Sequence, residues 1–484
     1  MVTELSAMCL AFIGVRMFSA INRRKGILFI IIGYSLIVAC AGCVQWGLDM
    51  SVGNKWNNIL FFSNSGIWGA WAGIGLVVVM GISQRSQYVV CWRIFICIFS
   101  VLLLLSRSRA SWLGVVVSIG YYLLNNKAVV YYLKNHLYVI FACGMVAMIA
   151  CWGLYRYKQP SADGRLLIWK VSSGMIAAHP WVGQGKDAFR QHYLYAQADY
   201  FRHYFKREEI MRADNVAYPY NELLKLSLEY GVIGVMLFAA LFLSCLLRKC
   251  ENQIDVILCA LLLFLGVYGL FAYPSDIWNL QMLLFCVMGC LSIEKQRYSR
   301  GKCFFYCAFL CFSSIVCYGL FRYRYLEYLV NDIIRENVDR TFLPVSQLKD
   351  LESYPMLYER YVQYCSMKSP DSLQTLEILE EAIRYIPSSP LFCELGDCYL
   401  KQGLILQSEE AYKQAKFILP GRFLPRYKLF SLYRRYGKQT EAVEEAREIL
   451  SLPVKIDNTL SLKIRGEVRR FLYKTQRQET AFGK

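Results

Sequence analysis

Apolar runs about as long as a bilayer is thick alternate with short polar segments through the first two thirds of the chain. A helical membrane span needs about 20 mostly apolar residues. Runs that approach this length predict about ten spans, near residues 5–21, 26–44, 66–82, 88–105, 110–124, 137–154, 231–247, 254–272, 277–293 and 303–320. After about residue 350 the pattern changes to amphipathic helices with many charged positions. The chain therefore predicts an all-α protein, a polytopic transmembrane helical bundle followed by a soluble helical domain.

The polar stretches suggest where these parts begin and end. We expect a transmembrane domain over residues 1–325, with a large loop over 155–230 on its outer side. A linker over 326–349 precedes helical repeats over 350–475, and a short tail covers 476–484.

The repeat signal comes from prolines at a fixed interval. Pro387, Pro420 and Pro453 recur every 33 residues. The positions that fit tetratricopeptide spacing are Leu395, Gly396, Tyr399, Tyr412, Ala415 and Pro420, then Leu429, Tyr433, Ala442 and Pro453. Such repeats stack helix pairs over a continuous core. We expect them to bind a protein partner, although they could instead only cap the membrane domain.

Composition and charge support this picture. The chain is 56% hydrophobic and carries a net charge of +18, which is typical of a membrane protein with basic cytoplasmic loops. Every second short loop is basic, through Arg23, Arg24, Lys25, Arg85, Lys127, Lys134, Arg248, Lys249, Lys295, Arg297, Arg300 and Lys302. That side is predicted to be cytoplasmic, so the loop over 155–230 and the C-terminal domain face the opposite side.

The large outer loop is itself basic. Residues 155–220 contain ten Lys or Arg and six acidic residues. Two interpretations stay open: a basin for an anionic ligand, or an ordinary charged, solvated loop. The 19 cysteines and four histidines show no zinc-binding spacing, so we expect no metal site.

Four short motifs on the outer side hold most of the candidate chemistry. SRSRASWLG over 106–114 places Arg107 and Arg109 at a membrane edge, where arginine either snorkels to the interface or binds an anion. GRLLIWKVSSGMIAAHPWVGQG over 164–185 predicts a short amphipathic helix that ends in a glycine turn. YPYNELLKLSLEYGVIG over 218–234 predicts a helix start and then a break at a glycine. FAYPSDIWN over 271–279 predicts a Pro-broken reversal.

The order of these motifs resembles the O-antigen ligase and O-antigen polymerase superfamily. SNSGIWGAWAGIGL over 63–76 and FAYPSDIW resemble motifs of its Bacteroidetes-type members, which often carry C-terminal tetratricopeptide repeats. The resemblance covers roughly residues 60–290 and the architecture of the tail. It implies transfer of a glycan from undecaprenyl diphosphate on the periplasmic face of the bacterial inner membrane. The acceptor would be a hydroxyl of a lipid, a glycan or a protein. The resemblance implies that the reaction needs no metal or other cofactor. It also implies that the protein contacts membrane lipids and no nucleic acid.

The resemblance also assigns a donor site. Arg109 and Arg165 match the arginines of the family pattern and would bind the carrier diphosphate. A guanidinium can donate two parallel hydrogen bonds to phosphate oxygens. Fixed cations also stabilise the negative charge that develops on a leaving phosphate. Further candidates for substrate binding are Arg107, Trp169, Lys170, Arg190 and Asn221.

The acceptor side departs from the family. Members commonly have His directly before the motif's Asn, whereas this chain has Tyr220 before Asn221. Tyrosine ordinarily has a pKa of about 10, so at neutral pH it is a donor rather than a base. Three interpretations stay open. Tyr220 positions the acceptor; or Glu222, and less readily His203 or Asp214, takes the proton; or the protein is inactive. Asn221 and Glu222 also fit an ordinary helix start.

The predicted activity is therefore that of a glycan ligase. The alternatives are a polymerase acting on the same kind of donor, a non-catalytic membrane scaffold for glycan assembly, and a transporter. For a transporter, the few charged residues within the spans give little support.

Overall fold

The computed structural model describes residues 21–52, 65–83, 87–157, 159–204, 206–291, 318–319, 321–335, 342–343, 345–352, 354–454 and 459–482. Within these ranges every regular element is a helix, so the predicted all-α class is confirmed. The expected spans 5–21 and 303–320 lie almost wholly outside the described residues, as do Arg85, Lys295, Arg297, Arg300 and Lys302 of the basic loops.

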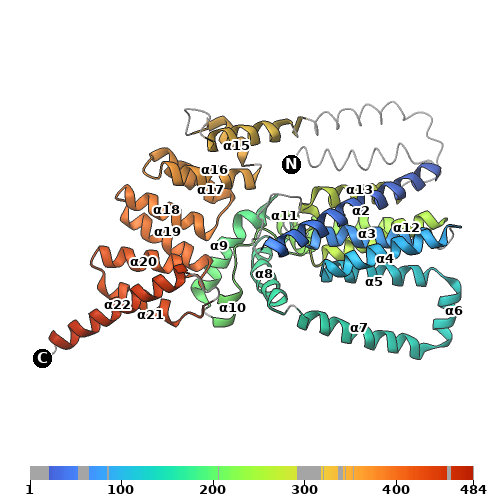
Figure 1. Cartoon of the computed structure of the whole chain (residues 1–484), viewed down its shortest axis with the longest axis horizontal. Coiled ribbons are helices and arrows are strands. Elements are labelled where there is room, and N and C mark those ends of the chain that lie inside the picture. Colours follow the sequence, from blue (N-terminus) through green and yellow to red (C-terminus); the bar gives the residue numbers. More distant parts are fainter. Residues whose placement is uncertain are drawn as a thin grey trace. The chain divides into compact units, whose positions relative to one another are not determined.

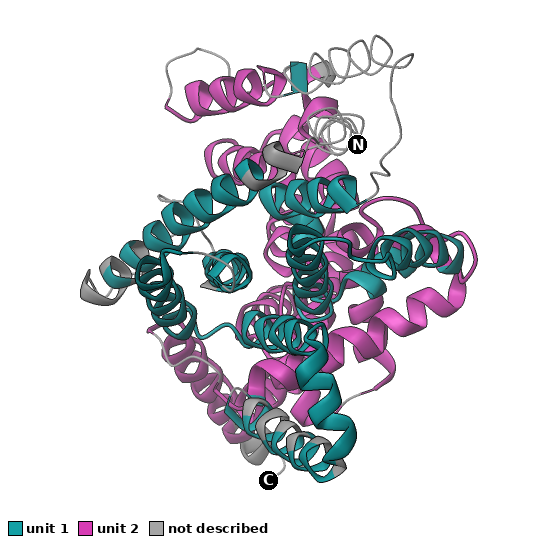
Figure 2. Ribbon diagram, turned by 90° about the vertical axis from the view of Figure 1, so that its right-hand side faces the viewer, with its two compact units in different colours: residues 1–159, 220–227, 232–320 teal, residues 160–219, 228–231, 321–484 magenta. Residues whose placement is uncertain are grey.

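The chain divides into two compact units (Figure 2). Unit 1 comprises residues 1–159, 220–227 and 232–320, and unit 2 comprises residues 160–219, 228–231 and 321–484. The large loop therefore belongs to the same unit as the C-terminal helices, although more than 100 residues separate them in the sequence. The pattern of apolar and polar positions did not predict this grouping.

Unit 1 is built from apolar helices. They are α2 (Ile21–Val52), α3 (Ser65–Ser83), α4 (Val89–Leu105), α5 (Arg109–Leu124), α6 (Lys127–Asn135), α7 (Leu137–Tyr157), α12 (Gln253–Gly269) and α13 (Trp278–Leu291), with most of α11 (Glu222–Leu246). A single 3₁₀ turn, η1 (Pro274–Asp276), joins α12 to α13. The helices expected near 66–82, 88–105, 110–124, 137–154, 254–272 and 277–293 are thus all present.

Some of these helices could span a membrane, judged by their length and composition. Among the described residues, three helical segments are long and apolar enough to cross a membrane: Gly26–Val44, Gly66–Ser83 and Glu222–Leu246. A fourth is possible if α5 and α6, which meet at a 90° bend, count as one broken span. Helices α4, α12 and α13 are apolar but shorter. The total of about ten spans stays a prediction.

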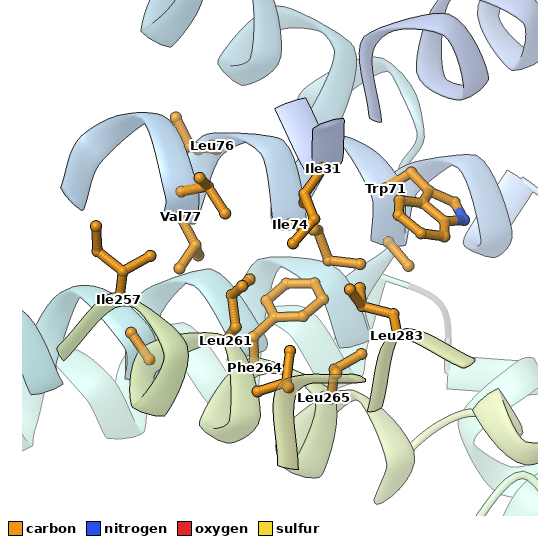
Figure 3. Packing of buried hydrophobic residues seen from close by; sticks show 14 of the residues in the cluster. Ile31, Trp71, Ile74, Leu76, Val77, Ile257, Leu261, Phe264, Leu265 and Leu283 are labelled. Atoms are coloured by element: carbon orange, nitrogen blue, oxygen red, sulfur yellow. The ribbon is translucent and has the colours of Figure 1, made fainter. Parts of the chain in front are cut away.

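The core of unit 1 lies where α3, α5 and α12 meet. Figure 3 shows the buried residues that α2, α3, α12 and α13 contribute to it. Phe264 of α12 is fully buried there. A Cβ added to Gly73 of α3 would lie 2.6 Å from the Phe264 ring, and one added to Gly114 of α5 would lie 2.8 Å from it. Small residues at membrane helix interfaces allow this close approach, so the two glycines make room for one aromatic ring.

Unit 2 combines two sets of helices (Figure 1). The loop contributes α8 (Gln159–Ala178), α9 (Ala188–His203) and α10 (Arg207–Arg212). The C-terminal part contributes α15 (Val345–Leu351), α16 (Pro355–Lys368), α17 (Leu373–Tyr385), α18 (Ser389–Lys401), α19 (Ile405–Ile418), α20 (Phe423–Arg435), α21 (Gln439–Ser451) and α22 (Thr459–Phe482).

From α16 to α22, each helix packs against the next one in the sequence. Within the pair α18 and α19, a Cβ on Gly396 would lie 2.4 Å from the Tyr412 ring, so this glycine permits close packing, as the repeat pattern requires. Helix pairs that stack in sequence order are what tetratricopeptide repeats form. The assignment to that repeat type stays a prediction.

Helix α9 anchors the loop to the C-terminal helices. The Tyr195 hydroxyl donates to the Ile383 carbonyl at 2.9 Å, and Gln197 Nε2 donates to the Ile418 carbonyl at 2.7 Å. Arg202 reaches the Gln414 amide oxygen on α19. Because Gln197 is almost fully buried, its bond to a helix-end carbonyl satisfies two polar groups that water cannot reach.

Candidate functional site

The SRSR motif forms the turn between α4 and α5. Ser108 is the N-cap of α5, and its hydroxyl accepts from the Ser111 backbone N–H and lies 2.8 Å from the Ser111 hydroxyl. Arg107 sits just before this cap with a φ of 50°, a left-handed conformation that is costly for a residue with a side chain. A Cβ on Gly69 of α3 would lie 2.5 Å from the Ser106 hydroxyl. The turn is therefore held tightly against the start of α3.

The two arginines of this turn differ in position. Arg107 occupies the turn and is exposed, whereas Arg109 is the first residue of α5 and is half-buried. Both lie where one predicted helix ends and the next begins, and only Arg107 lies in the turn itself. Their place at a membrane edge stays a prediction. At a helix start, the backbone N–H groups and the positive end of the helix dipole face the same way. Arg109 thus adds a full positive charge to an end that already favours anions.

The second strained residue precedes α11. Tyr220 has a φ of 53°, and the next residue, Asn221, caps the helix by accepting from the Leu224 backbone N–H at 3.0 Å. The predicted helix start at Asn221 is confirmed. The Tyr220 ring packs edge-on against the Tyr273 ring, with centroids 5.4 Å apart. Asn221 Oδ1 is thus engaged by the helix backbone, while Tyr220 is held in a conformation that a tyrosine does not adopt by preference.

The first turn of α11 makes a polar cluster with the YPSD turn. The Glu222 carboxylate accepts from the Ser275 backbone N–H at 2.8 Å. Lys225 forms an ion pair with Asp276 at 2.8 Å and donates to the Ser275 hydroxyl at 3.0 Å. Sequence reasoning missed Lys225, Ser275 and Asp276. The signal available was the three-residue spacing of Glu222 and Lys225, which places both on one helix face.

The two strained turns lie at the same end of the unit 1 bundle. Gly269, at the end of α12, contacts the Glu222 side chain, since a Cβ there would lie 3.1 Å from it. The preceding residue, Tyr268, donates to the Gly66 carbonyl at the start of α3 at 3.1 Å. Gly69, less than one turn further along α3, touches the SRSR turn. A continuous set of contacts therefore joins the Glu222 cluster to the arginine turn.

In unit 2, the predicted amphipathic helix is α8. Arg165 is half-buried on it, one turn before Trp169. The Trp169 indole N–H donates to the Pro219 carbonyl at 3.0 Å. This bond ties α8 to the chain directly before Tyr220. Trp169 therefore has a structural partner, and its predicted contact with substrate remains a hypothesis.

Lys170 is already paired with other protein groups. Its ammonium donates to the Tyr200 hydroxyl at 2.6 Å and to the Glu209 carboxylate at 3.0 Å. These bonds raise the pKa of Lys170. Burial alone would raise the pKa of Glu209, but bonds from Tyr200 and Lys170 outweigh it and lower that pKa. Since Glu209 neutralises the ammonium, Lys170 offers less free charge to a substrate than its position in the motif indicated.

Arg190 lies beside the left-handed residue that begins α9. Its guanidinium is 3.7 Å from the Asp187 carboxylate and 5.9 Å from the centre of the Tyr218 ring. Asp187 has a φ of 61°, and its backbone N–H donates to the buried Glu229 carboxylate at 3.1 Å. Arg190 therefore lies beside Tyr218, and its ion pair with Asp187 keeps it there. The Glu229 carboxylate fixes Asp187 by accepting its backbone N–H.

The HPWVGQG turn follows α8 and ends it, as predicted. Its backbone packs closely against the break in α11, and glycines permit this close approach. Gly183 and Gly231 have φ angles of 71° and 64°, and α11 is kinked at Gly231. A Cβ on Gly183 would lie 2.5 Å from the Glu229 backbone, and one on Gly231 would lie 2.1 Å from the Trp181 carbonyl. Gln184 N–H donates to the Leu228 carbonyl at 2.8 Å. We call this contact between residues 181–187 and 228–231 the loop clasp.

The two lesser base candidates have other partners in unit 2. The His203 ring bonds the Asp199 carbonyl at 2.9 Å within α9. The Asp214 carboxylate accepts from the Asn215 N–H at 3.0 Å and faces Arg422 at 3.9 Å. Both residues therefore have partners within unit 2, and the choice of Glu222 as the base stays a hypothesis.

Comparison with known proteins identifies the central part of the chain. Residues 94–239 match the O-antigen ligase family. This stretch is an O-antigen ligase domain. It includes Arg107, Arg109, Arg165, Trp169, Lys170, Arg190, Tyr220, Asn221 and Glu222, whereas Ser275 and Asp276 lie beyond it. No curated protein matches the chain.

The O-antigen ligase domain runs from α4 into α11 and takes residues from both units. This match supports glycan processing of the O-antigen ligase or polymerase type, and the long apolar helices support a membrane protein. The resemblance of the motifs to this superfamily is thereby confirmed. The roles of individual residues remain proposals.

Proposed function

We propose that this protein transfers a glycan from undecaprenyl diphosphate to an acceptor hydroxyl on the periplasmic face of the bacterial inner membrane, as a ligase. The observation that carries the proposal is the strain at Arg107 and Tyr220, whose turns lie at one end of the unit 1 bundle. Left-handed conformations of residues with side chains cluster at functional sites because the surroundings must enforce them. Both turns also lie within the O-antigen ligase domain.

The reaction needs one bond made and one broken. The acceptor oxygen attacks C1 of the first sugar, the C1–O bond to the diphosphate breaks with its electron pair, and the hydroxyl proton passes to a base. Negative charge grows on the leaving phosphate oxygen, so the most useful catalytic groups are fixed cations at that oxygen. We assign this role to Arg109 and Arg165, with Arg107 and Arg190 as further cations along the carrier and glycan.

On the acceptor side, the proposal gives Tyr220 and Glu222 separate tasks. Tyr220 positions the acceptor, because its ring is fixed against Tyr273 and its phenol is a donor at neutral pH. Glu222 takes the proton: Ser275 orients its carboxylate, and a carboxylate retains lone pairs after one hydrogen bond. Lys225 and Asp276 hold the Ser275 turn in place.

Replacement of Arg165 tests the assignment. In a strain that lacks the gene, Arg165→Ala should restore no surface glycan while the protein reaches the membrane at the wild-type level. Arg165→Lys should restore little, since an ammonium cannot fork onto two phosphate oxygens. Arg156→Ala is the control, because Arg156 is an exposed arginine near the start of the same loop. Full surface glycan in the Arg165→Ala strain would overturn the proposal.

The glycans of the deletion strain separate ligase from polymerase. Loss of attachment with carrier-linked polymer accumulating supports the ligase. Loss of chain length with single units still attached supports a polymerase at the same site. If the deletion strain keeps both glycan attachment and glycan chain length, the result favours a scaffold that other proteins can replace.

A further inference from the structure

The positive charge of the C-terminal region is concentrated in its last helix. Residues 321–458 contain 19 Lys or Arg against 20 Asp or Glu, and are nearly neutral. Residues 459–484, which include α22, contain seven Lys or Arg against two acids. A charge confined to one helix differs from the general basic bias of the chain and marks a separate surface.

One face of α22 is used for packing. Ile464 and Val468 are buried against the neighbouring helices, together with Ser461 and Thr475. Glu467, the acid in the middle of the helix, pairs with Arg434 at 2.9 Å and accepts from the Tyr427 hydroxyl at 2.7 Å. This acid is therefore engaged by α20.

The outward face carries the positive charge. Lys463, Arg470, Lys474 and Arg477 are exposed and recur at intervals of seven, four and three residues. At 100° per residue these positions fall within roughly 60° of one another. They form one line of cations, which we call the α22 stripe.

Two large apolar side chains border the stripe. Leu462 is 63% exposed and Tyr473 is 65% exposed, and helical spacing puts both on the side of the stripe where Arg469 also lies. Cations interleaved with a tyrosine and a leucine suit the interface of a bilayer, where the charges meet lipid phosphates and the apolar groups enter the headgroup region. A soluble polyanion would contact only the cations, so the exposed leucine and tyrosine favour a lipid surface.

We propose that the outward face of α22 docks onto an anionic phospholipid surface. The chain is a membrane protein, so a lipid surface is always in its surroundings, and the complementary charge is supplied by phosphate headgroups. This docking is independent of glycan transfer. It would hold the C-terminal helices at a membrane whatever glycan the site handles.

Vesicle flotation of the full-length protein tests the proposal. The protein is reconstituted in neutral nanodiscs and mixed with vesicles of phosphatidylcholine alone or with added phosphatidylglycerol. It should float only with the anionic vesicles, and high salt should release it. The variant Lys463→Gln, Arg470→Gln, Lys474→Gln and Arg477→Gln should bind roughly a thousandfold more weakly, at about 1 kcal/mol for each cation.

A matched variant separates this stripe from general charge. Lys368→Gln, Arg384→Gln, Arg435→Gln and Arg447→Gln remove four exposed cations from other C-terminal helices and should leave flotation unchanged. Equal losses in both variants would overturn the proposal. So would binding of a soluble phosphorylated glycan through the stripe without binding of anionic vesicles. Circular dichroism melts check that both variants stay folded.

Discussion

Lys225 and Asp276 form an ion pair at 2.8 Å, and each side chain is only about 15% exposed. The pair joins the first turn of α11 to η1, and these segments are far apart in the sequence. Because Lys225 also donates to Ser275, the pair fixes the turn whose N–H holds Glu222. A contact of this kind contributes both to stability and to the geometry of the candidate site.

A double-mutant cycle measures this contact. Lys225→Met and Asp276→Asn should each lower the free energy of unfolding by about 2 kcal/mol, since each leaves a largely buried group without its partner. The double variant should lose less than the two single losses combined, with a coupling of about 1 kcal/mol or more. Thermal unfolding in detergent gives the values.

The exposed pair Arg324 and Glu327, at 2.8 Å on one helix, is the control. It should show a coupling below about 0.5 kcal/mol. If the two couplings are equal, the Lys225–Asp276 pair has no special structural role.

The loop clasp makes Gly231 intolerant of a side chain. Gly231→Ala should destabilise the protein by about 3 kcal/mol or more, because a Cβ would meet the Trp181 carbonyl at 2.1 Å and the positive φ is strained for alanine. Gly174→Ala, on α8 with nothing within 4 Å of its Cβ, should be neutral or stabilising by up to about 1 kcal/mol. Melting temperatures of the two variants test this, and a stable Gly231→Ala protein would rule out the clasp.

Glu222 and Tyr220 should respond differently to small changes. Glu222→Gln keeps an oxygen that can accept from Ser275 but removes the base, so glycan transfer should fall about 100-fold or more. Tyr220→Phe keeps the ring against Tyr273 and should cost less than tenfold. Rates of transfer from a lipid-linked donor measure both. The reverse order would assign the acceptor chemistry to the Tyr220 hydroxyl.

The C-terminal helices should lose stability in acid partly through one carboxylate. Burial would raise the pKa of Glu409, but hydrogen bonds from Lys413 and Lys438 outweigh it and lower that pKa to about 2. A depressed pKa contributes stability above the unfolded value of 4.5, and this is lost as the pH falls toward 2. After solvent screening we expect about 1 kcal/mol.

Glu409→Gln tests this by comparison with wild type between pH 5 and pH 2. The variant should be less stable at pH 5, and the difference should shrink toward pH 2. Glu410→Gln, whose side chain is 67% exposed, should show no such trend. A difference between Glu409→Gln and wild type that does not change with pH would contradict the assignment.

Features that depend on neighbouring residues could be predicted from the sequence. Apolar runs predicted α3, α4, α5 and α7, because the length of an apolar helix follows from hydrophobic periodicity. Asn221 as a cap, Gly231 as a break and the reversal at Pro274 follow from local backbone preferences. The order of the motifs also pointed to the O-antigen ligase superfamily, and residues 94–239 match that family.

Features that depend on distant residues required the tertiary structure. The sequence indicated Lys170 as a candidate for substrate binding in a basic loop, but the fold pairs it with Glu209. It showed GQG as a turn, but the fold uses that turn to hold the kink of α11. Hydrophobicity and helix propensity are properties of a local window, whereas the partner of a charged or backbone group depends on which segments meet. The sequence alone therefore determined the helices and their breaks, and only the tertiary structure decided which charges are paired and which turns are locked.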